Sequence, residues 1–161
     1  MQVEGLLSAQ SRADFADTVE QLLGAIEAGG LTVFARIDHA AGAAAAGLTL
    51  RPTQLLIFGT ARGGTPLMQA QQLLGIELPL RALVWQDAAL NTWISWSDVK
   101  WLAQRYALPQ TAAEAVTKLA ALLKGLVQQA IAAAAQEAEL DEELEDSFPA
   151  SDPLPWSHDS R

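Results

Sequence analysis

At residues 31–58 the sequence reads LTVFARIDHAAGAAAAGLTLRPTQLLIF, in which two β-rich runs flank a segment of alanine and glycine. The runs, residues 31–37 and 54–58, are rich in branched and aromatic residues that favour strands. The unbroken apolar character of the second run predicts a central strand covered on both faces. Residues 40–47 are small enough to form a short, closely packed helix. This stretch therefore predicts strand, short helix and central strand in succession.

The residues before this stretch predict a strand and a helix. Apolar residues recur at helical spacing from Ser11, which we expect to cap the helix together with Asp14, to Gly29, where the helix stops. Residues 4–8 can form a short strand ahead of this helix. Together with residues 31–37, these elements predict a compact β-α-β opening.

The residues after the stretch predict a hairpin and two helices. Residues 81–86 and 92–96 are β-rich runs separated by a connection of hairpin length, so we expect them to pair as an antiparallel hairpin. A brief helix is expected at residues 67–74, after a proline. A capping box at Thr111 and Glu114 opens a long C-terminal amphipathic helix. The whole pattern predicts an α/β fold of the α+β kind.

The acidic residues are unevenly distributed along the chain. Residues 1–136 contain ten acids and nine bases, whereas residues 137–161 contain nine acids and one base. The second segment also contains three prolines and too little apolar surface to offset the ordering of its chain. We therefore expect a single domain at residues 1–136, which includes the C-terminal helix, and an acidic, disordered tail at residues 137–161.

The composition excludes several classes of function. The chain has no cysteine, which rules out disulfides, thiolate metal sites and cysteine nucleophiles. A near-neutral body with an acidic tail offers no basic stripe to nucleic acid and should be repelled by anionic membranes. No apolar run reaches the ~18–20 residues that span a bilayer, and the N-terminus lacks the pattern of a signal peptide. We expect a soluble cytoplasmic protein that binds neither nucleic acid nor membrane.

Several short motifs resemble those of a known bacterial family. They are Asp38-His39, Gly47, Arg51-Pro52, Phe58-Gly59, Gly64-Thr65-Pro66-Leu67-Met68 and Leu78-Pro79-Leu80. Over residues 4–108 the chain resembles the bacterial family called domain of unknown function 302. The resemblance implies a compact α/β domain that can pair as a homodimer, and it brings no established activity. The chain departs from the family pattern at Thr60-Ala61, where Asn-Pro commonly follows the glycine, and at Ala89-Leu90-Asn91, which replaces a glycine-containing turn.

The glycine-rich connection after the central strand is the best candidate for a binding site. Its glycines can turn backbone N–H groups toward an anion, to which Arg62 adds charge and Thr65 a hydroxyl group. We expect the end of the strand at residues 31–37 to reach the same strand-end crevice. The alternative is structural, with Thr65 capping the next helix and Asp38 capping the alanine-rich helix. The candidate ligand-binding residues are Arg36, Asp38, His39, Arg62, Gly63, Gly64 and Thr65.

The evidence for catalysis is thin. His39 is the only histidine before the tail, so a Ser/His/Asp triad cannot be assembled with any specificity. An oxygen and nitrogen metal site built from His39, Asp38 and Glu77 has no further support. We assign no catalytic residue, cofactor or metal. The sequence leaves open whether the protein is an enzyme and favours a protein without catalytic activity.

Aromatic residues suggest two interaction surfaces. Three tryptophans, Trp85, Trp93 and Trp96, lie on the predicted hairpin, which indicates that this part of the sheet is covered by the long helix or by a second subunit. We expect a homodimer. In the tail, which carries an SFPASDP segment, Phe148 and Trp156 stand among prolines and acids and can anchor a protein partner, unless the tail only solubilises the domain.

Three hypotheses for function follow, in decreasing order of support. The first is a domain that binds a small molecule or anion at the crevice beside the glycine-rich connection. The second is a protein-interaction adaptor that acts through its acidic Phe/Pro/Trp tail. The third is an enzyme of a kind that the motifs do not reveal.

Overall fold

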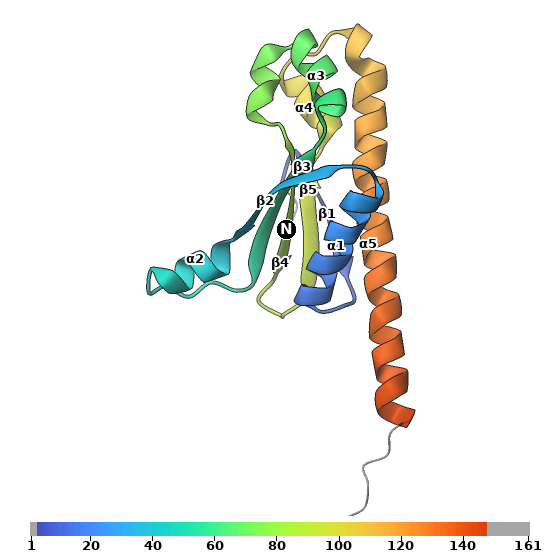
Figure 1. The fold of residues 1–161 in the computed structure, drawn as a ribbon. Helices are drawn as coiled ribbons and strands as arrows, with labels where there is room; N and C mark the ends of the chain where they lie inside the picture. Colours follow the sequence, from blue (N-terminus) through green and yellow to red (C-terminus); the bar gives the residue numbers. More distant parts are fainter. Residues whose placement is uncertain (1–2, 148–161) are drawn as a thin grey trace, which may run out of the picture.

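The computed structural model describes residues 3–147, which form one five-stranded sheet with two of the helices packed on one of its faces (Figure 1). The α+β fold class is therefore confirmed. In chain order the elements are β1 (Leu6–Ser11), α1 (Phe15–Ala28), β2 (Thr32–Asp38), α2 (His39–Ala45), β3 (Thr53–Gly59), α3 (Ala61–Ala70), η1 (Gln72–Ile76), β4 (Leu80–Gln86), β5 (Thr92–Ser97), α4 (Val99–Arg105), η2 (Gln110–Ala112) and α5 (Ala113–Ser147).

The strands lie in the order β1-β5-β4-β3-β2, and every neighbouring pair is antiparallel. The β-α-β opening and the β4–β5 hairpin are confirmed, although β1 and β2 occupy opposite edges of the sheet. The predicted central strand is β3, which has a neighbour on each side, while β4 holds the middle position. The predicted short helix is α2.

The core lies between the sheet and the pair α1 and α5. Strand residues that point toward these helices are fully or almost fully buried, as at Leu56, Val84 and Ile94. Side chains alternate along a strand, so the next residues, such as Leu55 and Leu83, point to the other face, where they are half-buried. The prediction that residues 54–58 are covered on both faces is therefore wrong for this chain, because both covering helices pack on the same side (Figure 1).

The helix α1 starts from a different cap than expected. Asp14 is its N-cap, and its carboxylate accepts a hydrogen bond of 2.8 Å from the backbone N–H of Asp17. Ser11 instead ends β1, and its buried hydroxyl oxygen accepts a hydrogen bond of 2.8 Å from the hydroxyl group of Thr18. The prediction failed because the local sequence offered two capping residues three positions apart.

The start of α5 also differs from the prediction. A short 3-10 turn, η2, contains Thr111, and no side chain caps that turn. Glu114 forms an ion pair with Lys118 one turn further along α5. The predicted capping box is therefore absent from the described residues.

The helix α5 is longer than predicted. It continues past residue 136 to Ser147 and extends beyond the sheet (Figure 1), whereas its last buried residue is Ala134. An 18-residue window within residues 110–147 has a mean hydropathy of 1.2, so by length and composition alone the helix could cross a membrane. The hydropathy is weak evidence for a membrane-spanning helix, because the apolar face of α5 packs on α1 and the outward face of α5 carries Lys124 and two glutamines. The boundary at residue 136 and the cytoplasmic location stay predictions.

The β4–β5 hairpin is closed by one carboxylate rather than by glycine. Asp87 Oδ1 accepts hydrogen bonds from the backbone N–H groups of Ala89 and Asn91, at 2.9 and 3.0 Å. Its Oδ2 accepts from Trp93 Nε1 at 2.9 Å and from the side-chain amide of Asn91 at 3.1 Å. Leu90 adopts the left-handed conformation with a φ of 65°, the position that glycine takes without strain. These donors, the Trp93 indole foremost, lower the pKa of Asp87 from 3.8 to about 2.

We expect Asp87→Asn to lower the melting temperature at neutral pH, since an amide is a weaker acceptor for these four donors. Because the pKa of Asp87 is depressed on folding, its stabilising effect is present above about pH 4 and is lost as the pH falls toward 2. The difference in melting temperature between the wild type and Asp87→Asn should therefore shrink over this range in thermal unfolding followed by circular dichroism.

A matched substitution at Asp17 provides the control. Partial burial and the nearby Asp14, Glu137 and Asp141 raise the pKa of Asp17, so Asp17→Asn should leave the melting temperature at neutral pH unchanged or higher. If the two variants lost the same stability at every pH, the proposed role of the Asp87 carboxylate in the hairpin would be incorrect.

Candidate functional site

The glycine-rich segment is the first part of a helix and not an open loop. The helix α3 begins at Ala61 and includes Gly63 and Gly64, which were predicted to lie in a connection, whereas Gly59 is the last residue of β3. Thr60 is its N-cap, and the Thr60 hydroxyl oxygen accepts a hydrogen bond of 3.1 Å from the backbone N–H of Gly63. The prediction that Thr65 caps this helix is therefore wrong, since Thr65 lies inside it. Because glycine has a low helix propensity, the sequence did not predict that α3 begins as early as Ala61.

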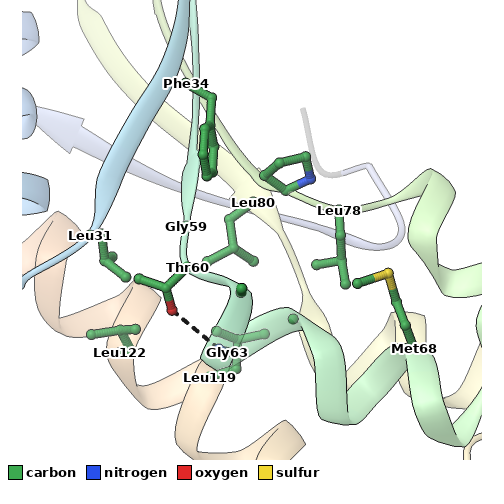
Figure 2. Close-up of a pocket in the computed structure, with 13 residues that line it drawn as sticks. Leu31, Phe34, Gly59, Thr60, Gly63, Met68, Leu78, Leu80, Leu119 and Leu122 are labelled. Carbon is green, nitrogen blue, oxygen red and sulfur yellow. Dashed lines mark hydrogen bonds between the residues drawn. The ribbon is translucent and has the colours of Figure 1, made fainter.

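A cavity of about 270 Å³ opens beside this helix start (Figure 2). Its walls come from the start of β2, the end of β3, the first turns of α3, the segment that leads into β4, and α5. The residues that line it are Leu31, Phe34, Gly59, Thr60, Ala61, Gly63, Gly64, Met68, Leu78, Pro79, Leu80, Leu119 and Leu122. Almost all of the lining is hydrocarbon. Among the lining residues, Thr60 alone has a polar side chain. We refer to this cavity as the α3 pocket.

Two glycines keep the floor of the α3 pocket open. A Cβ atom at Gly64 would lie 3.4 Å from Leu78 Cδ1 and 3.8 Å from the methyl carbon of Met68. A Cβ atom at Gly63 would lie 3.5 Å from the Thr60 hydroxyl oxygen. These are ordinary contact distances, so a larger side chain at Gly64 would project among the apolar residues of the pocket.

The sequence-predicted site residues fall into two separate groups. In the sheet Arg36 pairs with Leu56 and Asp38 pairs with Gln54, whereas Gly59, which leads into α3, pairs with Thr32 at the opposite end of β2. The expectation of one common crevice is therefore wrong. It assumed parallel neighbours, whose ends meet at one edge, and β2 and β3 are antiparallel.

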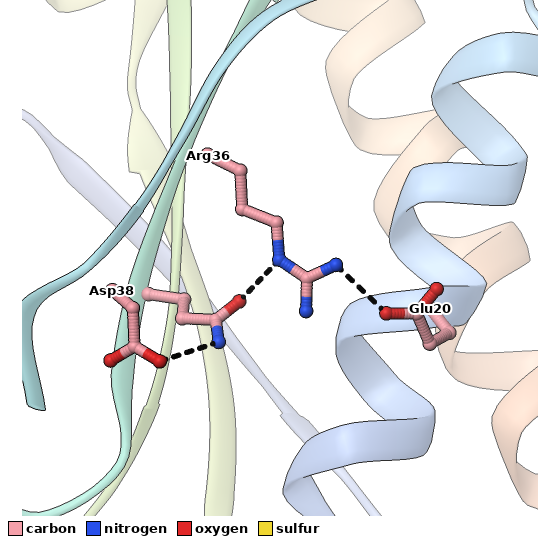
Figure 3. A network of polar contacts seen from close by, with 4 residues as sticks. Glu20, Arg36 and Asp38 are labelled. Carbon is pink, nitrogen blue, oxygen red and sulfur yellow. Dashed lines mark hydrogen bonds and ion pairs between the residues drawn. The ribbon is translucent and has the colours of Figure 1, made fainter. Parts of the chain in front are cut away.

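Arg36 and Asp38 belong to a polar network that joins three elements (Figure 3). Arg36 Nε donates to Gln54 Oε1 and Arg36 Nη1 donates to Glu20 Oε1, both at 2.9 Å. The Gln54 amide nitrogen donates to Asp38 Oδ2 at 3.2 Å. Asp38 Oδ1 accepts from the N–H of Ala41 at 2.8 Å, which lowers the pKa of Asp38 and caps α2. The capping role that was considered for Asp38 is therefore confirmed, and these side chains satisfy one another.

The remaining predicted residues lie on the surface. His39 is exposed at the first position of α2, and Arg62 and Thr65 are exposed on α3 without lining the pocket. Of the predicted ligand-binding residues, Gly63 and Gly64 alone line the α3 pocket. Phe148 and Trp156 lie outside the described residues. Within residues 3–147, no three or more histidine and acidic side chains come close enough to hold a metal ion.

Sequence reasoning missed most of the apolar wall of the α3 pocket. Leu119 and Leu122 are 85 or more positions away from Leu31 and Phe34 and meet them only because α5 crosses the end of the sheet. One signal was available in α5, where Leu122 lies beside Leu123, so that the apolar side chains extend beyond a single line along the helix. Leu123 is buried in the core, and Leu122 lines the pocket.

The chain matches the model of a known protein family. The family model described as "Domain of unknown function DUF302" matches residues 7–126. A solved structure described as the crystal structure of an uncharacterized conserved protein DUF302 from Bacillus stearothermophilus resembles this chain with a TM-score of 0.71. The two chains are 16% identical, and the alignment covers 80% of this chain and 99% of the other. At this identity the likeness supports the fold alone.

Curated relatives carry a functional name. Proteins named "Fluoride-specific ion channel FluC 1" from Brucella suis and Brucella abortus are each 45% identical to this chain over 104 residues. The match covers 65% of this chain, and it covers 41% of the Brucella suis protein and 38% of the Brucella abortus protein. The chain thus spans about two fifths of the length of these relatives.

Proposed function

The chain belongs to the family described as domain of unknown function DUF302, and because this membership brings no activity, we propose from the geometry that the α3 pocket binds a small amphiphilic molecule with an anionic end. The observation that carries the proposal is an apolar cavity that adjoins the start of a ten-residue helix. The first turn of a helix has backbone N–H groups without partners inside the helix and lies at the positive end of its dipole.

The lining of the pocket determines which part of the ligand goes where. Leu31, Leu78 and Leu122 surround the cavity with hydrocarbon, which favours an apolar body (Figure 2). The anionic end would lie near the N–H of Ala61, with exposed Arg62 as its neighbour. This refines the expectation of an anion site, because a bare inorganic anion would lose its hydration shell against an apolar wall. The volume of about 270 Å³ suits a short-chain or medium-chain carboxylic acid.

Octanoate is a suitable probe for the α3 pocket. In a titration followed by amide NMR, octanoate should shift the signals of Thr60, Gly63 and Gly64. Gly64→Leu should fill the cavity and weaken octanoate binding by tenfold or more, a loss of about 1.4 kcal/mol. Octanol, which has the same chain without the charge, should bind more weakly than octanoate if the helix start contributes.

Gly24→Leu is the matched control for this experiment. Gly24 lies in α1, where a Cβ atom would meet nothing within 4 Å, so the same substitution adds the same apolar group away from the pocket. Gly24→Leu should bind octanoate like the wild type. Equal affinities of Gly64→Leu and the wild type would remove the α3 pocket as the binding site.

A second candidate function is support of a fluoride-specific channel, and the similarity to the Brucella relatives favours it. A region that is part of a longer channel protein in one organism can work beside a separate channel in another. The apolar α3 pocket is poorly suited to fluoride, a small and strongly hydrated anion. The domain would therefore act through contact with the channel and not by holding the ion.

Growth in the presence of fluoride tests this second function. Deletion of the gene from the source bacterium should lower the fluoride concentration that stops growth, and the wild-type gene on a plasmid should restore it. Sodium chloride at the same concentration is the control for general salt stress. Unchanged fluoride tolerance after deletion would argue against a role beside the channel.

The helix α2 and the tryptophan pair of the hairpin offer a surface for the expected homodimer. The helix α2 projects from the body and has no buried residue, although six of its seven residues are alanine or glycine (Figure 1). The segment after it exposes Leu48 by 67% and Leu50 by 48%. At the same end of the sheet, Trp85 and Trp93 stack with ring centroids 6.2 Å apart on the face that α1 and α5 leave open. We propose that α2 of each subunit covers this tryptophan pair of the other.

The mass of the protein in solution tests this dimer. Light scattering after gel filtration should give twice the chain mass of 17.1 kDa for the wild type. Leu48→Glu should shift the protein toward the monomer, because a charge would have to be buried at the interface. Leu73→Glu changes a leucine of similar exposure, 72%, on η1 and should remain dimeric. A monomeric wild type, or the same mass for both variants, would contradict the proposal.

A further inference from the structure

A second cavity lies on the opposite face of the sheet from the α3 pocket. It has a volume of about 390 Å³ and lies between the outward side chains of β4 and β5 and the helix α4. Leu6, Leu55 and Leu83 contribute apolar surface to it, and Trp101 contributes an aromatic ring. We call this cavity the α4 groove. It is at the end of the sheet away from α2, since β5 leads into α4 at Ser97.

One guanidinium group in the α4 groove has no acidic partner. Arg105 lies over two aromatic rings, 5.3 Å from the Trp101 centroid and 5.7 Å from the Tyr106 centroid. Within residues 3–147, no carboxylate approaches Arg105 to within ion-pair distance. The contact with the rings holds the charged group in place without neutralising it.

The carboxylate of Glu77, which lines the groove, already accepts two hydrogen bonds. Glu77 Oε2 accepts from Arg81 Nη2 at 2.7 Å, and Glu77 Oε1 accepts from the Tyr106 hydroxyl group at 2.8 Å. The side chain of Glu77 is only 16% exposed. This hydrogen bond, together with burial, raises the pKa of Tyr106, so its hydroxyl group stays a neutral donor. Glu77 therefore positions Arg81 and Tyr106, and it forms no ion pair with Arg105.

A second carboxylate limits the charge that the groove can accept. Glu4 lines the α4 groove, and its Oε1 accepts a hydrogen bond of 3.0 Å from Trp101 Nε1. With Glu4 and Glu77 opposite Arg81 and Arg105, the four charges sum to zero. A singly charged anion can pair with Arg105, whereas a multiply charged one would be repelled by Glu4.

We propose that the α4 groove binds a small organic monocarboxylate with an aromatic body. The carboxylate would pair with Arg105, which guanidinium geometry favours, and with the donors of Arg81 that Glu77 leaves unused. The aromatic body would lie against Leu83 and the Trp101 ring. This site is separate from the α3 pocket, since the two have no lining residue in common.

Benzoate is the probe for this site, with benzyl alcohol as the neutral analogue and inorganic phosphate as the more highly charged anion. Titration of the full chain followed by amide and indole NMR should show benzoate shifting the Trp101 indole signal. Benzyl alcohol and phosphate should bind at least tenfold more weakly. Arg105→Gln should weaken benzoate binding at least tenfold, while Arg51→Gln, an arginine at the other end of the sheet, should not.

Two further variants test the α4 groove independently of Arg105. Leu6→Glu adds a negative charge at a groove residue that is 43% exposed and should weaken benzoate binding even if Arg105→Gln proves unstable. Gly64→Leu fills the α3 pocket and should leave benzoate binding unchanged. The proposal is overturned if benzoate does not shift the Trp101 signal, if benzyl alcohol binds as tightly as benzoate, or if the folded Arg105→Gln and Leu6→Glu variants bind like the wild type.

Discussion

The packing of α5 against α1 and the sheet is the contact on which the rest of the structure depends. Leu123, Leu126 and Val127 are buried, and Ala130 and Ala134 have no exposed surface, which lets the two helices approach closely. Burial of each leucine or valine contributes about 1.5–3 kcal/mol. Because α5 closes the core along the whole sheet, the position of α5 also determines which cavities form at the edges of the core.

The α3 pocket is a direct consequence of this packing. The part of α5 that contains Leu119 and Leu122 crosses the end of the sheet where β3 leads into α3. Glycine at positions 63 and 64 removes the side chains that would fill the remaining space. The site is therefore made by a helix start, two glycines and the apolar surface of a helix that lies more than fifty residues further along the chain.

One-sided coverage of the sheet creates the surfaces on the other face. With α1 and α5 on the same side, Leu55, Leu83 and the two stacked tryptophans remain only half-buried. At one end of this face, α4 follows β5 and brings Arg105 beside the aromatic rings. At the other end α2 projects without buried residues of its own. The two ends therefore offer different chemistry, with an arginine over aromatic rings at α4 and an alanine-rich helix beside a tryptophan pair at α2.

The sequence by itself determined the kinds of elements and most of their places. The apolar periodicity of α1 and α5, the β-rich runs of the hairpin and the cap at Asp38 are local properties, so they could be recognised without the fold. Only the tertiary structure decided how the strands pair. An apolar run has no direction, so nothing local shows that β2 and β3 are antiparallel. Their pairing places Arg36 beside Leu56, whereas Arg62 lies in α3, beyond the end of β3 that pairs with Thr32. The same holds for both cavities, since each is assembled from residues that long-range packing alone brings together.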